Sequence, residues 1–274
     1  MQDPILSVAH LSVDLGGRGI LRDVSFDLHP GQLCALIGEN GAGKTTLLRS
    51  LLGLTPHRAG QVWIEGVPAG QRRILVGYVP QKIVFDADVP LRTRDLVQLG
   101  LDGHRLGLPL FSSRKKTMVD QALQMVGAEA FADQRVGELS GGQQQRAVIA
   151  HALVRQPRLL ILDEPLANLD FRSANALVAL LGTLARTQRI AMLVTAHDMN
   201  PLLPVMDRLI YLVGGQVATG SVEEVVQPEV LSKLYGYPVT VLRHGQRVLV
   251  LPDAAVEPSG VIAAGQVPSP EKAN

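Results

Sequence analysis

The chain has 274 residues, of which 46% are hydrophobic and 19% charged, and its 26 basic and 25 acidic side chains leave a net charge of +1. This composition excludes a disordered polyelectrolyte and a broad basic surface for nucleic acid, and the length favours one large domain or a domain with an insertion. The single cysteine, Cys34, excludes an internal disulfide network and indicates a reducing compartment, while no apolar run reaches the roughly 18 residues of a spanning helix and the N-terminus lacks a signal-peptide pattern.

Strand and helix signals follow one another in a regular order. Short β-type runs between Gly and Pro residues predict strands at 7–15, 25–28, 33–37, 61–64 and 74–79. One helix interrupts them, from about Gly43 to Leu52. The apolar period then changes, which predicts helices at 93–99, 115–126 and 143–154. The strand signal returns at 159–162, 190–195, 208–212 and 216–219, with a helix at 171–185.

The order strand, helix, strand predicts an α/β fold with a parallel sheet. We expect a main domain at 1–236, made of a core at 1–88 and 157–236 and a helical insert at 89–156. The segment 237–274 is expected to hold a small hairpin, with strands at 239–242 and 247–251, and then a disordered tail rich in Pro, Gly and Ala.

A glycine-rich loop between a predicted strand and a predicted helix matches G-x-x-x-x-G-K-[ST]. Its residues are Gly38, Glu39, Asn40, Gly41, Ala42, Gly43, Lys44 and Thr45, and Thr46 follows. The glycines allow backbone N–H groups to surround a triphosphate, and the helix N-terminus adds positive potential. Lys44 is placed to reach the β- and γ-phosphates and Thr45 to offer its hydroxyl to Mg²⁺. The motif therefore predicts a nucleotide-phosphate site.

The apolar run at 159–162 is too short for a helix and leads directly into Asp163 and Glu164. Carboxylates at the carboxyl end of a buried parallel strand face the crevice in which α/β sheets bind ligands. We expect Asp163 to hold the Mg²⁺ shell and Glu164 to polarise a water for attack on the γ-phosphate. His197 follows another predicted strand and is expected at the same edge.

A second helix start carries an anion-site pattern. Ser140 and Gln143 have the spacing of a capping box, and Gly141 and Gly142 between them leave the helix N-terminus uncovered. A helix N-terminus of this kind attracts a phosphate group. Taken alone, the pattern is that of an ordinary helix start.

Six strings occur in one order: GENGAGKT, the glutamine of YVPQK, LSGGQQQR, LLILDEP, LANLD and the histidine of TAHD. Together they resemble the ATPases of ATP-binding cassette (ABC) transporters, over about 5–236. The resemblance implies a P-loop NTPase (RecA-like) core with a parallel sheet, an antiparallel β subdomain and an α-helical insert. It also implies a head-to-tail homodimer in which 38–46 of one subunit and 140–143 of the other enclose each ATP.

The resemblance also implies residue roles. Lys44 and Thr45 resemble the phosphate and Mg²⁺ residues, and Glu164 the general base. Gln81 resembles the sensor of water and Mg²⁺ that links the core to the helical insert. His197 resembles the histidine that contacts the γ-phosphate, and Asp170 the residue that reports across the dimer.

Two positions depart from the family pattern. Leu15 stands where an adenine-stacking aromatic residue is usual, which puts base selectivity in doubt because aliphatic packing replaces stacking. His151 stands where arginine is common, and the sequence offers no physical account of it.

The resemblance implies that the pore is a separate integral membrane permease, with a solute-binding protein outside the cell acting indirectly and this chain at the cytoplasmic face of the membrane. Three segments, at 76–100, 104–127 and 222–241, resemble the manganese/zinc/iron import group. Import of an iron chelate, haem or cobalamin is the nearest alternative.

A soluble ABC ATPase without a pore is the other function class. The basic runs at 72–73 and 114–116 are not interleaved with aromatic residues, so we expect a solvated surface and no nucleic-acid partner. The segment 82–94 mixes apolar and charged residues, which is typical of a partner surface, and Phe85 is its expected anchor for the membrane subunit. That these residues only pack the insert onto the core stays open.

Overall fold

The computed structural model describes residues 3–71, 75–81, 85–86, 88–102, 113–245 and 247–253. The expected tail after 253, the basic pair at 72–73 and residues 82–84 and 87 of the expected partner surface lie outside the described residues. Among the described residues, no helix has the length and apolar character that crossing a bilayer requires.

The core is a six-stranded sheet in the order β10-β9-β3-β8-β7-β6. Its strands are β3 Leu33–Ile37, β6 Val76–Val79, β7 Leu159–Leu162, β8 Ala191–Ala196, β9 Arg208–Val213 and β10 Gln216–Gly220. All neighbours run parallel except β10, which pairs antiparallel with β9 at the edge. The predicted α/β class and parallel core are therefore confirmed.

Apolar side chains cover both faces of this sheet. On β3, Ala35 and Ile37 belong to one buried cluster, with α4 and α5, whereas Cys34 and Leu36 belong to the other, with α1 and the second sheet. A parallel strand that is buried on both sides reads as a continuous apolar run, which is why β3 and β7 were predicted with the bounds observed. Burial raises the pKa of the Cys34 thiol to about 12, so this cysteine behaves as a small core residue.

The second sheet is antiparallel, in the order β2-β1-β4-β5. Its strands are β1 Leu6–Leu15, β2 Arg18–Leu28, β4 Ala59–Ile64 and β5 Val67–Pro68. Strand β2 begins earlier than the predicted 25–28, because it pairs with β1 directly after a turn at Gly16 and Gly17, both at positive φ. The start of β2 carries exposed polar residues, so the sequence shows no apolar run there that would predict a strand.

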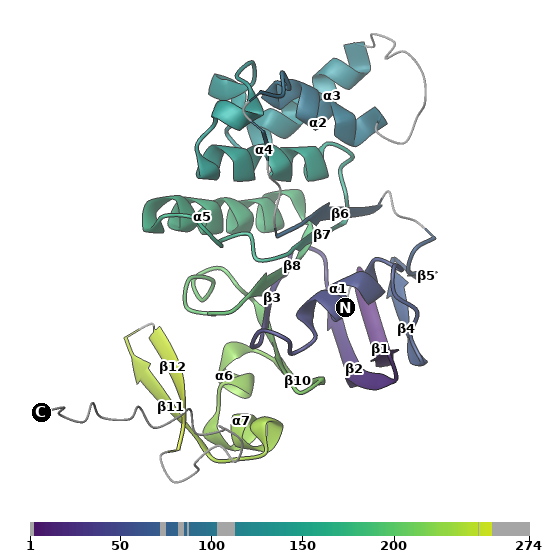
Figure 1. The fold of residues 1–274 in the computed structure, drawn as a ribbon, viewed down its shortest axis with the longest axis vertical. Helices are drawn as coiled ribbons and strands as arrows, with labels where there is room; N and C mark the ends of the chain where they lie inside the picture. Colours follow the sequence, from purple (N-terminus) through teal and green to yellow (C-terminus); the bar gives the residue numbers. More distant parts are fainter. Residues whose placement is uncertain are drawn as a thin grey trace, which may run out of the picture.

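Helices lie around the two sheets (Figure 1). They are α1 Lys44–Leu51, α2 Thr93–Asp102, α3 Ser113–Met125, α4 Gly141–Leu153 and α5 Phe171–Gln188, with short 3₁₀ turns at Glu129–Phe131 and Val136–Glu138. Helices α2, α3 and α4 contact one another and gather at one end of the molecule, beyond α5 (Figure 1). This is the region that the sequence predicted to be helical.

The C-terminal elements lie at the opposite end of the molecule (Figure 1). The hairpin is present, as β11 Val239–His244 and β12 Arg247–Pro252. Two short helices, α6 Val222–Val225 and α7 Pro228–Tyr235, were not predicted, since neither is long enough to show an apolar period. Val239 and Val248 are buried in the same cluster as the sheet, so the hairpin packs onto the core.

Candidate functional site

The glycine-rich loop joins the carboxyl end of β3 to α1. Gly41 and Gly43 have φ values of 82° and 112°, which residues with a Cβ rarely adopt. Gly38 has a different reason to be glycine, because a Cβ there would lie 2.5 Å from the carbonyl oxygen of Leu212 on β9. Gly43 is the N-cap of α1 and provides no side-chain hydrogen bond to the first turn. The N–H groups of that turn are thus left for an anionic ligand.

Lys44 is nearly buried, at 7% exposure, beneath this loop. Its Nζ donates to the carbonyl oxygens of Gly38 at 2.6 Å and Glu39 at 3.3 Å. The same nitrogen lies 3.7 Å from Oε1 of Glu164. A buried ammonium with one carboxylate partner places positive charge at the loop, which favours phosphate oxygens.

Asp163 and Glu164 follow β7 and are held by one hydroxyl. Thr195 Oγ1, on the neighbouring strand β8, donates to Oδ1 of Asp163 at 2.8 Å and accepts the backbone N–H of Glu164 at 2.7 Å. Glu164 has a φ of 46°, a strained conformation that turns its side chain at the sheet edge. Thr195 was not predicted from the sequence, because its only signal is a polar residue within a run of buried apolar ones.

Gln81 reaches the same place from the end of β6. Its Nε2 donates to Oε2 of Glu164 at 2.7 Å, and its own side chain is exposed. Tyr78, on β6, is a further neighbour that the sequence analysis missed: burial first, and then the charge of Asp163, raise the pKa of its phenol. The structure thus brings together Lys44, Asp163 and Glu164 with Gln81 at the carboxyl edge of the main sheet.

Oxygen donors suited to Mg²⁺ lie in this group. Asp163 supplies a carboxylate that is 6% exposed, and the neighbouring Thr45 and Gln81 are exposed and carry a hydroxyl and an amide oxygen. Hard oxygen ligands of this kind fit Mg²⁺, which binds few protein carboxylates and keeps other positions for substrate phosphates. Within the described part of the chain, no group of three or more His, Cys, Asp or Glu side chains gathers into a site for another metal.

Ser140, Gly141, Gly142 and Gln143 form the start of α4, where the predicted capping box is present. The N–H of Ser140 donates to Oε1 of Gln143 at 2.9 Å, and the N–H of Gln143 donates to Ser140 Oγ at 3.4 Å. A Cβ at Gly142 would lie 3.1 Å from Ser173 Oγ, so α4 and α5 begin side by side. No hydrogen bond or ion pair described for these residues joins them to the loop at 38–45.

Asp170 caps the neighbouring helix α5. It accepts the N–H of Ser173 at 2.9 Å and its hydroxyl at 2.7 Å. These hydrogen bonds lower the pKa of the exposed Asp170 carboxyl. The two helix starts therefore make a second group, separate from the first. In it the Asp170 carboxylate caps α5 beside the capped N-terminus of α4.

His197 directly follows β8 and is exposed. Leu15, at the end of β1, is 45% exposed and so offers aliphatic surface next to the turn that leads into β2. Neither residue makes a described hydrogen bond to the first group. Their roles remain those that the family resemblance implies.

The structure gives His151 a packing role. It lies on α4 where α2 crosses closely, and a Cβ at Gly100 would lie 2.5 Å from the His151 carbonyl oxygen and 3.3 Å from its ring. Burial, and then the charge of Arg155, lower the pKa of the imidazole. A flat neutral ring against a glycine fits this crossing, which accounts for the departure noted in the sequence.

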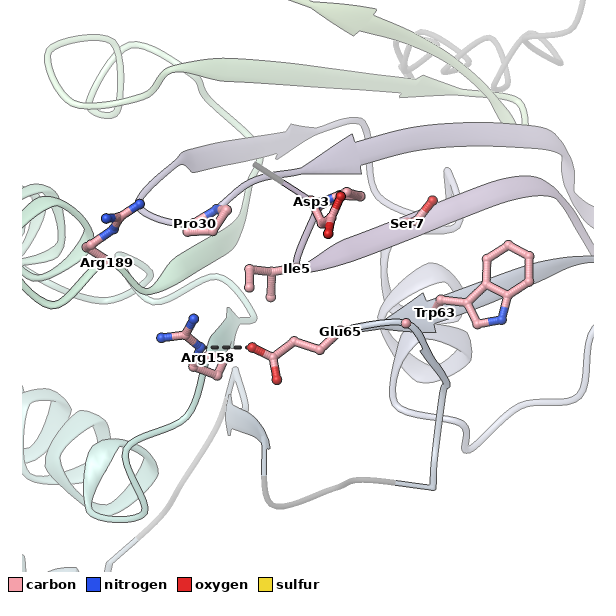
Figure 2. Close-up of a pocket in the computed structure, with 10 residues that line it drawn as sticks. Asp3, Ile5, Ser7, Pro30, Trp63, Glu65, Arg158 and Arg189 are labelled. Atoms are coloured by element: carbon pink, nitrogen blue, oxygen red, sulfur yellow. Dashed lines mark hydrogen bonds and ion pairs between the residues drawn. The ribbon is translucent and has the colours of Figure 1, made fainter. Parts of the chain in front are cut away.

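A hollow elsewhere in the molecule contains none of these residues (Figure 2). It lies beside the amino end of β7 and the carboxyl end of β4, where Arg158, just before β7, donates to Glu65, just after β4, at 2.9 Å. Trp63 and Arg189 also line it. This ion pair joins the two sheets at the edge opposite the candidate site.

The family model described as "ABC transporter" matches residues 21–167. The chain is 38% identical over 235 residues to the zinc import ATP-binding protein ZnuC of Halorhodospira halophila, covering 85% of this chain and 84% of that protein. It is 34% identical over 233 residues to the manganese transport system ATP-binding protein MntB of Halalkalibacterium halodurans, covering 85% of this chain and 92% of the relative.

Solved structures show the same architecture. A putative metal-chelate type ABC transporter in an inward-facing conformation matches with a TM-score of 0.76 and 26% identity, covering 92% of this chain and 99% of that one. A dimeric ATP-binding cassette in a post-hydrolysis state, bound to ADP and Pi, matches with a TM-score of 0.66 and 25% identity, covering 79% and 98%.

Proposed function

The chain belongs to the ATP-binding cassette transporter family, and from this premise we propose that it is the ATP-hydrolysing subunit of an importer for a divalent metal ion of the manganese, zinc and iron group. The observation that carries the proposal is the meeting of Lys44, Gln81 and Glu164 at the mouth of the glycine-rich loop. A buried cation, a hydrogen-bonded carboxylate and a glycine-rich loop that opens a helix N-terminus are the parts that phosphoryl transfer to water requires.

The residues divide the reaction between them. The N–H groups of Gly38–Thr46 and the Lys44 ammonium bind the phosphates. Glu164 accepts a proton from the attacking water, and Gln81 holds the carboxylate in position. His197 contacts the γ-phosphate from the neighbouring strand end. Thr45, Gln81 and Asp163 would hold Mg²⁺, which would supply charge neutralisation on the phosphate oxygens.

The second group suits a composite site. Ser140–Gln143 and Asp170 lie at the starts of α4 and α5 and make no described bond to the loop of the same chain. We propose that they face the ATP of a second copy, in a head-to-tail homodimer with two ATP molecules at the interface. The dimeric cassette among the structural matches supports this arrangement.

The transported substrate is inferred from relatives whose names give zinc or manganese transport. A chelate substrate is the second candidate, because one structural match is of a putative metal-chelate type transporter. In either case we propose that the chain is peripheral, at the cytoplasmic face of the membrane, where it binds a permease that receives its substrate from a solute-binding protein. We further propose 1–236 as the ATPase domain, with its insert at 89–156.

The test has two parts. Glu164→Gln should retain ATP binding, lower the rate of hydrolysis by roughly 10²- to 10⁴-fold and trap an ATP-bound dimer. Glu129→Gln, at an exposed carboxylate on the 3₁₀ turn, is the matched control and should hydrolyse ATP normally. Undiminished hydrolysis by Glu164→Gln would refute the general-base role. With the reconstituted permease and binding protein, turnover should be stimulated by Mn²⁺ or Zn²⁺, and stimulation only by an iron chelate would overturn the substrate assignment.

A further inference from the structure

The side chain of Asn200 pairs with the outer edge of strand β12. Its Nδ2 donates to the carbonyl oxygen of Val248 at 2.9 Å, and the N–H of Val248 donates to its Oδ1 at 2.7 Å. Val248 lies opposite Arg243 of β11, so both of its backbone groups face away from the hairpin partner. No other described strand pairs with this edge, and the side-chain amide takes the place of one by using both groups.

Asn200 belongs to the short loop that begins with His197. The Asp198 carboxylate accepts both the N–H and the Nδ2 of Asn200, at 2.9 and 2.7 Å. Met199, at 5% exposure, is buried in the main core. The loop is therefore fixed by the core on one side and by the hairpin on the other, and exposed His197 stands at its start.

The hairpin is itself firmly attached. Its inner face buries Val239 and Val248, at 5% and 8% exposure. The preceding helix α7 adds Tyr235, whose hydroxyl lies 3.2 Å from that of Tyr211 on β9. The Tyr235 and Tyr211 rings meet edge to face, with centroids 6.1 Å apart. A displacement of the hairpin would therefore be transmitted to Asn200 rather than absorbed locally.

We propose that Asn200 is a positioning residue through which the hairpin β11–β12 fixes the place of His197 for ATP hydrolysis. No hairpin residue then needs to contact the nucleotide for turnover to depend on the hairpin. The inference rests on the proposed role of His197. Because that histidine acts on the γ-phosphate as it is transferred, its misplacement lowers kcat and leaves KM nearly unchanged.

Asn200→Ala removes both bonds to Val248 and the Nδ2 bond to Asp198, and leaves the backbone N–H bond to Asp198 in place. In the purified full chain, kcat for ATP hydrolysis should fall about tenfold, with KM and the melting temperature close to those of the wild type. Val248→Pro removes the N–H from the other side of the contact, at an edge position where proline is tolerated, but it also exchanges a side chain that the hairpin buries. Measured per folded protein, its kcat should fall in the same way. The double variant should be no slower than Asn200→Ala alone, because the two changes break one contact.

Leu249→Ser is the matched control, since Leu249 is 54% exposed on the outer face of the same strand. It should keep wild-type kcat. A wild-type kcat in Asn200→Ala would overturn the inference, as would a loss of activity that only follows the loss of folded protein, or additive effects of the two changes. Failure of the proposed function would appear separately, as equal hydrolysis by the wild type and Glu164→Gln.

Discussion

Nε2 of Gln81 lies 2.7 Å from Oε2 of Glu164, although 83 positions separate the two residues in the sequence. Parallel pairing of β6 and β7 creates this contact, because it brings their carboxyl ends to one edge. Gln81 also precedes the segment that leads into the helical end of the molecule. A movement of the helical end can therefore shift Gln81 and, through its hydrogen bond, the Glu164 carboxylate proposed as general base.

Gln81→Ala should lower kcat for ATP hydrolysis by about tenfold to a hundredfold, because a hydrogen bond to a charged acceptor is worth about 1.5–3 kcal/mol. ATP affinity should change little, since Lys44 and the loop N–H groups remain. Gln227→Ala is the control: its Nε2 donates to the Glu223 carbonyl, far along the chain from the site. Steady-state kinetics check both, and a Gln81→Ala enzyme with wild-type kcat would contradict the positioning of Glu164.

Local patterns made half of this site predictable. The loop at 38–45 and the acidic pair at the end of β7 each consist of consecutive residues. The residue types and their spacing are therefore enough to indicate their chemistry. The family resemblance brought Gln81 into the prediction. Thr195 was missed because its function depends on which strand lies beside β7, and a run of apolar residues does not specify its neighbour.

The C-terminal part shows the same limit. The hairpin was predicted because two short β-type runs flank a turn at His244 and Gly245. The contact between Asn200 and Val248 was not, since its partners are 48 residues apart and one of them uses only backbone atoms. A backbone partner leaves no residue type for sequence reasoning to detect.

The free energy of unfolding should fall in mild acid because of the lowered pKa of His151. Burial and Arg155 lower the pKa of this imidazole from its ordinary value of 6.5 in the folded state. Below pH 6.5 the unfolded chain binds a proton that the folded chain does not, so the stability present above 6.5 is lost as the pH falls toward the lower folded value.

His151→Gln removes this titration. Between about pH 7.5 and about pH 5.5, the melting temperature of the wild type should therefore fall more than that of the variant. The other histidines are present in both proteins, so the difference between the two slopes isolates His151. Parallel slopes would show that its pKa is not lowered by folding.

The expected partner surface can be tested at Val89. Phe85 packs partly buried against the core, whereas Val89 is 48% exposed on a turn closed by its N–H bond to the Asp86 carbonyl at 3.2 Å. Phe85→Ala should leave ATPase activity of the free subunit within a few-fold of wild type but cost some stability as well as assembly.

Val89→Ser should weaken only the assembly with the membrane subunit. The melting temperature and the ATPase activity of the free subunit should not change. Co-purification with the permease measures this loss. Leu54→Ser, at a residue that is 59% exposed after α1, serves as the control for an exposed apolar residue elsewhere. Wild-type assembly of both Phe85→Ala and Val89→Ser would exclude this segment as the docking surface.

Phe171 should anchor the proposed ATP-bound dimer. It is 78% exposed at the first position of α5, next to Asp170 and beside the start of α4, so the described residues leave most of its ring uncovered. Burial of such a ring in the partner's surface stabilises a complex by about 1.5–3 kcal/mol, or roughly ten- to a hundredfold in Kd.

Phe171→Ala, made in the Glu164→Gln background that traps the dimer, should raise its dissociation constant by that factor in sedimentation experiments with ATP. The melting temperature without nucleotide should be unchanged, because the ring packs against little in the monomer and Asp170 still caps the helix. Leu249→Ala, at an exposed residue of the C-terminal hairpin, should leave the dimer intact. An unchanged dissociation constant for Phe171→Ala would place the dimer contact away from the start of α5. It would also contradict the proposed role of Asp170 in the dimer.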